Sequence, residues 1–229
     1  MAAAVPVDAV IVAGIDLDRL RGSAIYGRLP AAVTQALGPY AGASRMVAAW
    51  DSQGLLILAR GDFQLAPAGA TLVSPHLAIG GADDSVRAAM GRYRSPGGTR
   101  SGVLGYGMES LGTAPLWIAM RGGTALPFTG NAVNLARLLR LVEYAGIAVK
   151  PDRAAEFRIR ADAATADAAQ RFEESLRAFF SLAAVGETHR PDLAALLEVA
   201  RVERKGRVVT ATLQVPAEKV GDAIAALVP

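Results

Sequence analysis

The chain contains no cysteine. That absence excludes disulfide bonds, catalysis by a thiol and metal binding by cysteine thiolates, and it leaves the redox compartment open. Histidine is scarce as well, because the 229 residues include only His76 and His189. Neither histidine has a second histidine or a close carboxylate at the spacing of a metal site, so we predict a structural role for both and assign no metal ligand.

The sequence also lacks a long apolar run. Hydrophobic residues make up 52% of the chain, but apolar stretches such as residues 55–59 are far shorter than the roughly 20 residues that a helix needs to cross a bilayer. We therefore expect no integral membrane segment. The start at Met1 shows neither the basic region nor the apolar core of a secretory signal. We interpret it as a start codon on a trimmed chain, and we expect the upstream codons of the gene to encode a signal peptide.

The common catalytic signatures are missing. No serine lies in a G-x-S-x-G turn, and no G-x-x-x-x-G-K-[ST] loop is present. Gly105, Gly107 and Gly112 do not have the G-x-G-x-x-G spacing of a dinucleotide site, and we interpret them as part of a linker. We assign no catalytic residue and no cofactor.

Paired carboxylates are the remaining candidates for acid and base chemistry. They are Asp16 with Asp18, Asp83 with Asp84, and Glu173 with Glu174. Helix capping accounts for Asp16 and Asp83, because acids are common where a helix begins. Arg171 and Arg177 lie at helical spacing from the glutamates, which predicts a solvated face of ion pairs.

Positive charge is spread along the whole chain, and the net charge is only +3. Proteins that bind nucleic acid usually concentrate basic residues on one stripe, so we predict no nucleic-acid partner. The densest basic group is Arg87, Arg92, Arg94 and Arg100. We interpret this group as a solvated helix end in preference to an anion site.

The order strand, helix, hairpin, helix occurs twice. In the first half, a strand-like run at 9–15 precedes helical segments at 16–37 and strands around Val47 and Leu58. In the second half, the corresponding segments are a run at 115–121, a helix at 131–143, and strands around Ile147 and Ile159. Each half then closes on a strand and a helix whose inward residues are Val86 and Met90 in the first half, and Val220 and Ile224 in the second. A duplication is the economical explanation.

The strand signals favour an antiparallel sheet. Residues 201–215 form a hairpin pattern with Lys205 and Gly206 at the turn, and residues 51–54 close a comparable hairpin. Thr210, Thr212 and Gln214 alternate with apolar residues, which predicts one covered and one wetter sheet face. We therefore predict an α+β fold in which each unit is an antiparallel sheet with helices packed on one face.

Two further helices follow from apolar spacing. After Thr165, a predicted N-cap, one stripe contains Phe172, Leu176, Phe179, Phe180 and Ala183. A shorter stripe lies at 193–200.

The chain exceeds the usual size of one domain, which is roughly 100 to 150 residues. Residues 95–113 are rich in glycine and serine, and we place the boundary near Gly112. The expected units are 1–112 and 113–229, which form either separate sheets or one continuous sheet.

A family resemblance rests on both ends of the chain. Residues 5–9 (VPVDA), then a strand and residues 16–20 (DLDRL), look like the start of the mature part of uncharacterised exported bacterial proteins. Residues 202–209 (VERKGRVV) and 216–220 (PAEKV) are similar to the closing hairpin and helix of the same group. The resemblance implies export, to the periplasm or cell envelope, and an α+β repeat. It transfers no functional residue, because the group has no assigned activity.

Two classes of function remain. The first is a non-enzymatic extracytoplasmic interaction module that binds a protein, a lipid or its own copy through a sheet face or edge. The alternative is a small-ligand protein or enzyme with its site in a cleft between the two units, where Tyr106, Trp117, Arg121 and His76 would converge. A bound ligand would support the alternative, and a large buried contact between copies would support the first class.

Overall fold

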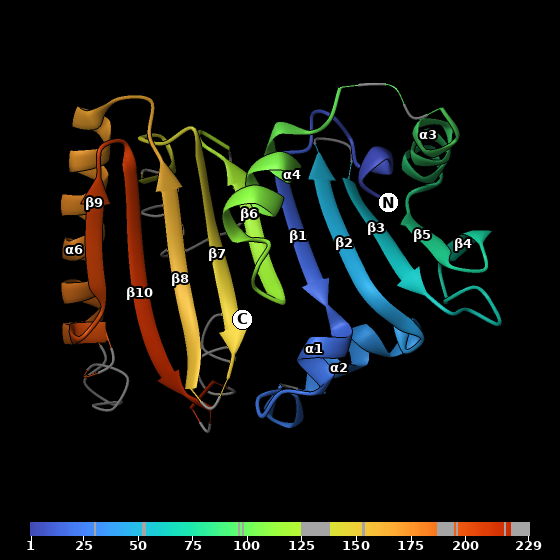
Figure 1. Cartoon of the computed structure of the whole chain (residues 1–229), viewed down its shortest axis with the longest axis horizontal. Coiled ribbons are helices and arrows are strands. Elements are labelled where there is room, and N and C mark those ends of the chain that lie inside the picture. Colours follow the sequence, from blue (N-terminus) through green and yellow to red (C-terminus); the bar gives the residue numbers. More distant parts are fainter. Residues whose placement is uncertain are drawn as a thin grey trace.

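The described residues form one ten-stranded antiparallel sheet with helices on it (Figure 1). The computed structural model describes residues 1–29, 31–51, 54–95, 97, 99–124, 138–152, 154–186, 195, 197–217, 219 and 220. The strand order across the sheet is β4-β5-β3-β2-β1-β6-β7-β8-β10-β9. The α+β class and the antiparallel pairing are therefore as the sequence predicts.

The first half of the chain contributes five strands and most of the helices. Its strands are β1 (Ile11–Asp16), β2 (Ala43–Asp51), β3 (Gly54–Gly61), β4 (Ala70–Ser74) and β5 (Leu77–Gly81). Its α-helices are α1 (Leu17–Arg21), α2 (Ala31–Leu37), α3 (Asp83–Arg94) and α4 (Gly102–Tyr106). Three short 3₁₀ turns are η1 (Ala2–Ala4), η2 (Tyr26–Arg28) and η3 (Gly38–Tyr40), and a π-helical turn, η4 (Gly107–Leu111), continues α4.

The second half contributes the other five strands, which are β6 (Leu116–Arg121), β7 (Tyr144–Pro151), β8 (Ala154–Asp162), β9 (Arg201–Lys205) and β10 (Val208–Pro216). Its long helix is α6 (Ala166–Gly186). Most of the helix expected at 131–143, Leu193 and Leu196 of the stripe at 193–200, His189 and Ile224 lie outside the described residues.

The two halves meet at a pair of hydrogen-bonded strands. β1 and β6 pair antiparallel over five residues, from Ile11 opposite Met120 to Ile15 opposite Leu116. The units expected at 1–112 and 113–229 therefore share one continuous sheet. Each half also has the same internal order, because β1-β2-β3-β5-β4 on one side corresponds to β6-β7-β8-β10-β9 on the other.

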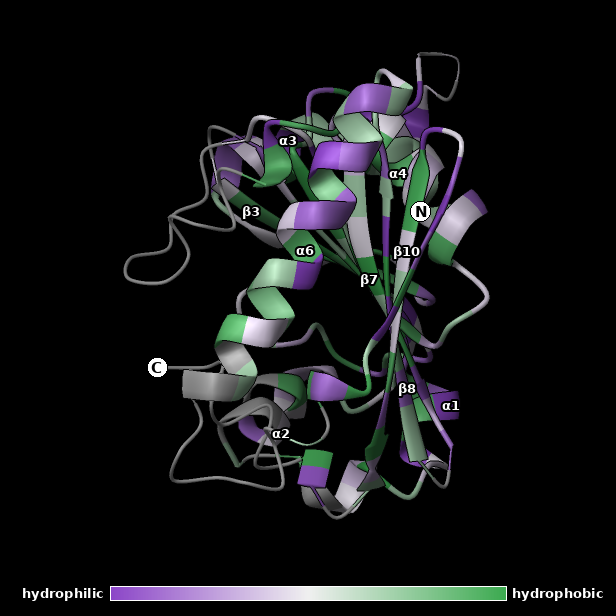
Figure 2. Ribbon diagram, turned by 90° about the vertical axis from the view of Figure 1, so that its left-hand side faces the viewer, coloured by the Kyte–Doolittle hydropathy of each residue, from purple (hydrophilic) through white to green (hydrophobic). Residues whose placement is uncertain are grey.

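Helices cover both faces of the sheet, which differs from the expectation of helices on one face. Val86 of α3 lies in a core cluster with Leu56, Leu58 and Trp117, on the face that α4 and η4 also cover. Phe172 of α6 packs in another cluster, which lies on the opposite face. Figure 2 shows the sheet nearly edge-on between α6 and α4. The strand sequences do not reveal this, because the alternation of apolar residues along a strand does not tell which helix covers which face.

The predicted linker is partly a buried helix. Residues 102–111 form α4 and η4, and Val103, Leu104 and Leu111 are among their buried side chains. Ser101 caps the segment by accepting a hydrogen bond from the Leu104 amide at 3.3 Å. The glycines here permit close packing on the sheet, a role that composition cannot distinguish from that of a flexible linker.

Several local predictions are confirmed. Asp16 caps α1 by accepting from the Arg19 amide at 3.1 Å, and Thr165 caps α6 by accepting from the Ala168 amide at 3.1 Å. The hairpin between β9 and β10 is present, although its turn is at Gly206 and Arg207, one residue later than predicted. Within the described part of the chain, no helix is both long enough and apolar enough to span a membrane.

Candidate binding surfaces

The carboxylate pairs are accounted for by structure. Asp16 caps α1 and also lies 3.5 Å from Arg45. Asp83 is not a cap, because Ala82 holds the N-cap position of α3 and Asp83 is the first helical residue. Asp84 pairs with Arg87 at 3.1 Å on an exposed surface. These acids suit the positive end of a helix and form no paired acid–base site.

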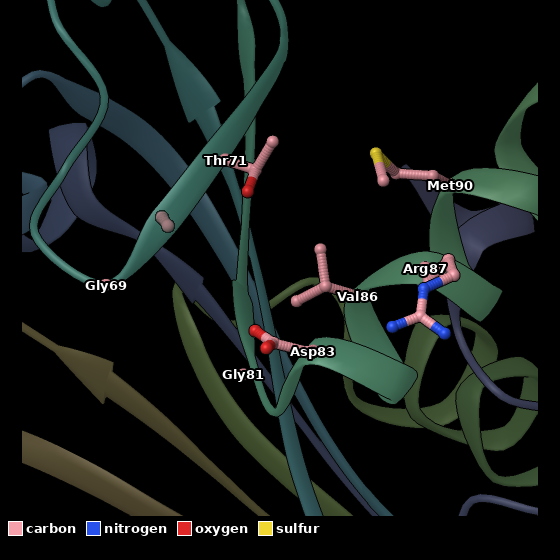
Figure 3. Close-up of a pocket in the computed structure, with 8 residues that line it drawn as sticks. Gly69, Thr71, Gly81, Asp83, Val86, Arg87 and Met90 are labelled. Carbon is pink, nitrogen blue, oxygen red and sulfur yellow. The ribbon is translucent and has the colours of Figure 1, made fainter.

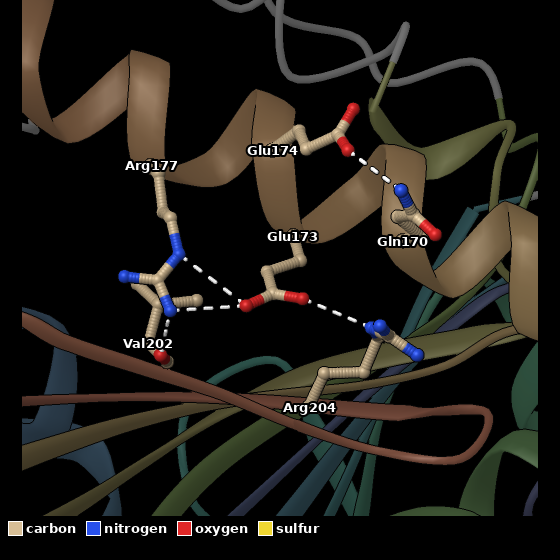
Figure 4. A network of polar contacts seen from close by, with 6 residues as sticks. All are labelled: Gln170, Glu173, Glu174, Arg177, Val202 and Arg204. Atoms are coloured by element: carbon tan, nitrogen blue, oxygen red, sulfur yellow. Dashed lines mark hydrogen bonds and ion pairs between the residues drawn. The ribbon is translucent and has the colours of Figure 1, made fainter.

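Glu173 joins α6 to the end strand β9 (Figure 4). Its carboxylate accepts from Arg177 at 3.0 Å, as the helical spacing predicts, and from Arg204 of β9 at 2.9 Å. These hydrogen bonds, first from Arg177 and then from Arg204, hold the pKa of Glu173 below its ordinary value. Glu174 instead accepts from the Gln170 side chain at 3.0 Å. The pair is structural, and only Glu173 links two elements.

His76 does have a carboxylate partner, which corrects the expectation from sequence. Its Nδ1 lies 2.7 Å from Asp62 Oδ1, and both side chains are largely exposed. Sequence spacing hides this pair because Asp62 follows β3 and His76 precedes β5, its neighbour in the sheet. Among the residues that the structure describes, no group of three or more metal-ligating side chains is present.

Of the four residues expected to converge in a cleft between the units, Tyr106 and Trp117 lie in one buried cluster, and His76 lies apart from them. Trp117 is buried under α4 and η4, and Tyr106 stacks on Tyr144 with ring centroids 5.3 Å apart. The Tyr106 hydroxyl donates to the Arg160 carbonyl at 3.1 Å, and burial raises the pKa of Tyr106. His76 directly precedes β5, which lies four strands away from β6 and its Trp117. Tyr106 and Trp117 are therefore part of the hydrophobic core.

Two arginines of the basic group make structural contacts. Arg92 donates to the Ala4 carbonyl through Nε at 3.1 Å and Nη2 at 3.0 Å, which ties α3 to the N-terminal turn. Arg87 pairs with Asp84. Two of the four arginines therefore already have partners, and an anion site receives no support from them.

An exposed apolar pair lies near the middle of the sheet. Ile118 of β6 and Ile147 of β7 are cross-strand neighbours, with 40% and 37% of their surface exposed. They share a sheet face with the cluster under α6. Isolated apolar exposure of this size is ordinary on protein surfaces.

The two end strands of the sheet differ in chemistry. β9 has the sequence RVERK, and four of its five side chains are charged. Charged side chains on an end strand discourage pairing with another chain. β4 has the sequence ATLVS and carries no charge. The β4 end of the sheet is therefore the end that can pair more readily with a strand of another chain.

A groove lies beside β4, between this strand and helix α3 (Figure 3). Its volume is about 510 Å³. Ala70 and Thr71 line it from the strand, and Asp83, Val86, Arg87 and Met90 line it from the helix. Sequence reasoning missed β4, although Pro67 and Gly69 before it and Pro75 after it are turn signals that bound a short strand-like run.

Comparisons with known proteins identify the fold alone. No model of a known protein family matches the chain, and no curated protein matches it. Three solved structures, all crystal forms of the protein TP0453, are similar to it. Form III has 10% sequence identity and a TM-score of 0.60 over 98% of this chain and 97% of that one. Form I has 10% identity and a TM-score of 0.57, with 100% and 98% covered, and form IV has 9% and 0.58, with 98% and 96% covered.

Proposed function

We propose that the protein is a non-enzymatic interaction module that binds a partner protein through the β4 end of its sheet. The observation that carries this proposal is the uncharged end strand β4, which contrasts with the charged end strand β9. An end strand presents unpaired N–H and C=O groups along one side, and these groups can pair with an extended segment of another chain.

The geometry limits the length of that segment. β4 pairs regularly with β5 from Ala70 to Leu72, and the register then shifts before Ser74. A bulge of this kind twists the end of a strand away from a partner. The bound segment is therefore expected to be short, with its pairing centred on Thr71.

The arrangement of the halves favours an interaction module over an enzyme with a site in a cleft. The join between them is filled by the paired strands β1 and β6. Trp117 and Tyr106, two residues expected in a cleft, are engaged in the core beside this join. A site between the units would have to displace these contacts.

We also propose that the halves arose by duplication, a relation that their matching strand orders support.

We further propose that the protein is exported to the periplasm or cell envelope, which the sequence resemblance supports. Fractionation of cells that express the intact gene tests export, since the proposal requires the mature chain outside the cytoplasm.

A charge placed on the end strand tests the binding proposal. Thr71 is exposed, so Thr71→Lys should preserve folding and block strand pairing. The matched control is Thr113→Lys, which adds the same charge at an exposed turn before β6. The wild-type protein is used to select from a phage-displayed library of random peptides, and its association state is followed by sedimentation.

We expect the wild type and Thr113→Lys to retain the same selected peptides and Thr71→Lys to lose them. A dimer that Thr71→Lys alone abolishes would also support binding through this edge. Equal binding by all three proteins would contradict the proposal. So would a monomeric wild type that retains no peptide.

A further inference from the structure

The groove beside β4 has an apolar part and a charged part. Val86 and Met90 lie one helical turn apart on α3, and both pack against the core cluster of the sheet. They form the apolar wall that faces Thr71 across the groove (Figure 3). Asp83 lies one turn before Val86, at the end of the groove near Gly81.

The charged part of the groove lining consists of one carboxylate, Asp83, and one guanidinium, Arg87. Asp84 is not among the lining residues. Arg87 is held by Asp84 at 3.1 Å. The Asp83 carboxylate is exposed at the groove wall, where it favours a cation.

The spacing of these two parts matches an extended peptide. Alternate residues of a strand point to the same side and lie roughly 6.6 Å apart. Asp83 precedes Val86 by three residues and Met90 by seven, which is about 4.5 Å and about 10.5 Å along the helix axis, so the strand spacing falls between these two separations. A strand added to β4 therefore presents side chains i and i+2 to the apolar wall and to Asp83.

We propose that the groove selects an extended segment of a partner protein with an apolar residue two positions from a lysine or arginine. This inference rests on the proposed function, since the segment pairs with β4 while its side chains enter the groove. The apolar side chain packs on Val86 and Met90, and the basic side chain pairs with Asp83. Main-chain pairing supplies affinity, and the two side chains supply specificity.

A second copy of the chain is a poorer occupant. Its strand β4 has no basic residue. Its strand β9 does have Val202 and Arg204 at the required spacing, but Val202 is buried under α6 and Arg204 is bound by Glu173. A free extended segment meets neither obstacle.

The test uses the library selection with Asp83→Asn and a matched control, Asp152→Asn, at an exposed position between β7 and β8. Peptides selected by the wild type should be enriched in the apolar-x-basic pattern in either direction. The tightest peptide is then synthesised with its basic residue intact or changed to glutamine, and binding is measured by fluorescence anisotropy at low and high salt.

Asp83→Asn should weaken binding of the basic peptide about twofold to fivefold, the range of an exposed ion pair. The same substitution should leave the affinity for the glutamine peptide unchanged. The loss of affinity for the basic peptide should become smaller at high salt. Asp152→Asn should change neither peptide.

Three outcomes overturn the inference. The first is that Thr71→Lys abolishes peptide binding but the selected peptides are not enriched in lysine or arginine, which would overturn the inference and leave the proposed function standing. A dimer dependent on β4, with no selected peptide, would do the same. Absence of both peptide binding and association would overturn this inference together with the proposed function.

Discussion

Two glycines make room for one tryptophan at the centre of the molecule. A Cβ atom on Gly14 of β1 would lie 2.3 Å from Trp117 Cε2, and one on Gly107 of η4 would lie 2.2 Å from Trp117 Cζ3. Real side chains do not approach this closely, so the ring occupies space that only glycine leaves open. This packing explains why a glycine-rich segment lies against the sheet here.

We expect Gly107→Ala to destabilise the protein by about 1 to 3 kcal/mol, because a methyl group there overpacks the indole ring. Gly105→Ala is the matched control, two residues earlier in the same helical segment, since a Cβ there meets no atom within 4 Å. That change should be neutral or stabilise the protein by up to about 1 kcal/mol through helix propensity. Urea unfolding measures both. Equal effects would show that Trp117 is not wedged between the glycines.

Glu173 makes a pH-dependent contribution at the same scale. Its pKa is lowered in the folded protein by the hydrogen bonds from Arg177 and Arg204. A carboxyl group with a lowered pKa stabilises the fold above its unfolded pKa, and this stabilisation is lost as the pH falls through the folded pKa. We expect Glu173→Gln to lower the free energy of unfolding by about 1 kcal/mol at pH 7 and by much less in strong acid.

The control for this prediction is Glu174→Gln, which alters the neighbouring contact with Gln170 and no bond to β9. Urea unfolding at neutral and acidic pH should show a difference between wild type and variant that depends on pH only for Glu173→Gln. A loss of the same size at both pH values would indicate a contribution from packing and not from the charge.

At the scale of elements, α6 shows what apolar spacing reveals and what it omits. The predicted stripe is correct at Phe172, Leu176 and Phe180, which are all buried. Phe179 belongs to the same predicted stripe but is 41% exposed, since this residue lies at the margin of the buried helix face. Period 3.6 locates a buried face without giving its width, which depends on what the helix covers.

This difference gives a matched pair of substitutions. Phe172→Ala should cost about 3 to 5 kcal/mol, because it leaves a cavity between α6 and the sheet. Phe179→Ala, the same change at an exposed position, should cost clearly less. Urea unfolding measures both, and similar costs would mean that α6 is rotated about its axis relative to the structure described here.

The candidate binding edge could not be predicted in the same way. The run from Ala70 to Ser74 is too short to show a period, and its place at the end of the sheet depends on strand order. The hairpins β2–β3 and β9–β10 were predictable because their turn residues are local signals. The ion pairs of Glu173 with Arg204 and of His76 with Asp62 join distant segments, so no spacing rule finds them.

At the scale of the whole molecule, the sheet and the core both cross the middle of the chain. One cluster unites Val12 and Leu56 of the first half with Trp117 and Ala148 of the second. Another unites Leu17 and Met46 with Val149 and Val215. Each half therefore buries part of its apolar surface on the other, and neither has a core that is complete without its partner.

We consequently expect the protein to unfold as one cooperative unit in spite of its two similar halves. The two tryptophans report on different places, because Trp50 lies in β2 of the first half, whereas Trp117 of β6 packs against Gly14 and Gly107 at the join between the halves. In Trp117→Phe the remaining Trp50 follows the first half, and in Trp50→Phe the remaining Trp117 follows the join, while circular dichroism follows the whole molecule. Within each variant, the urea midpoints from fluorescence and circular dichroism should coincide. A fluorescence transition that precedes the loss of circular dichroism in either variant would mean that one half unfolds first, so that the β1–β6 pair joins two separately stable domains.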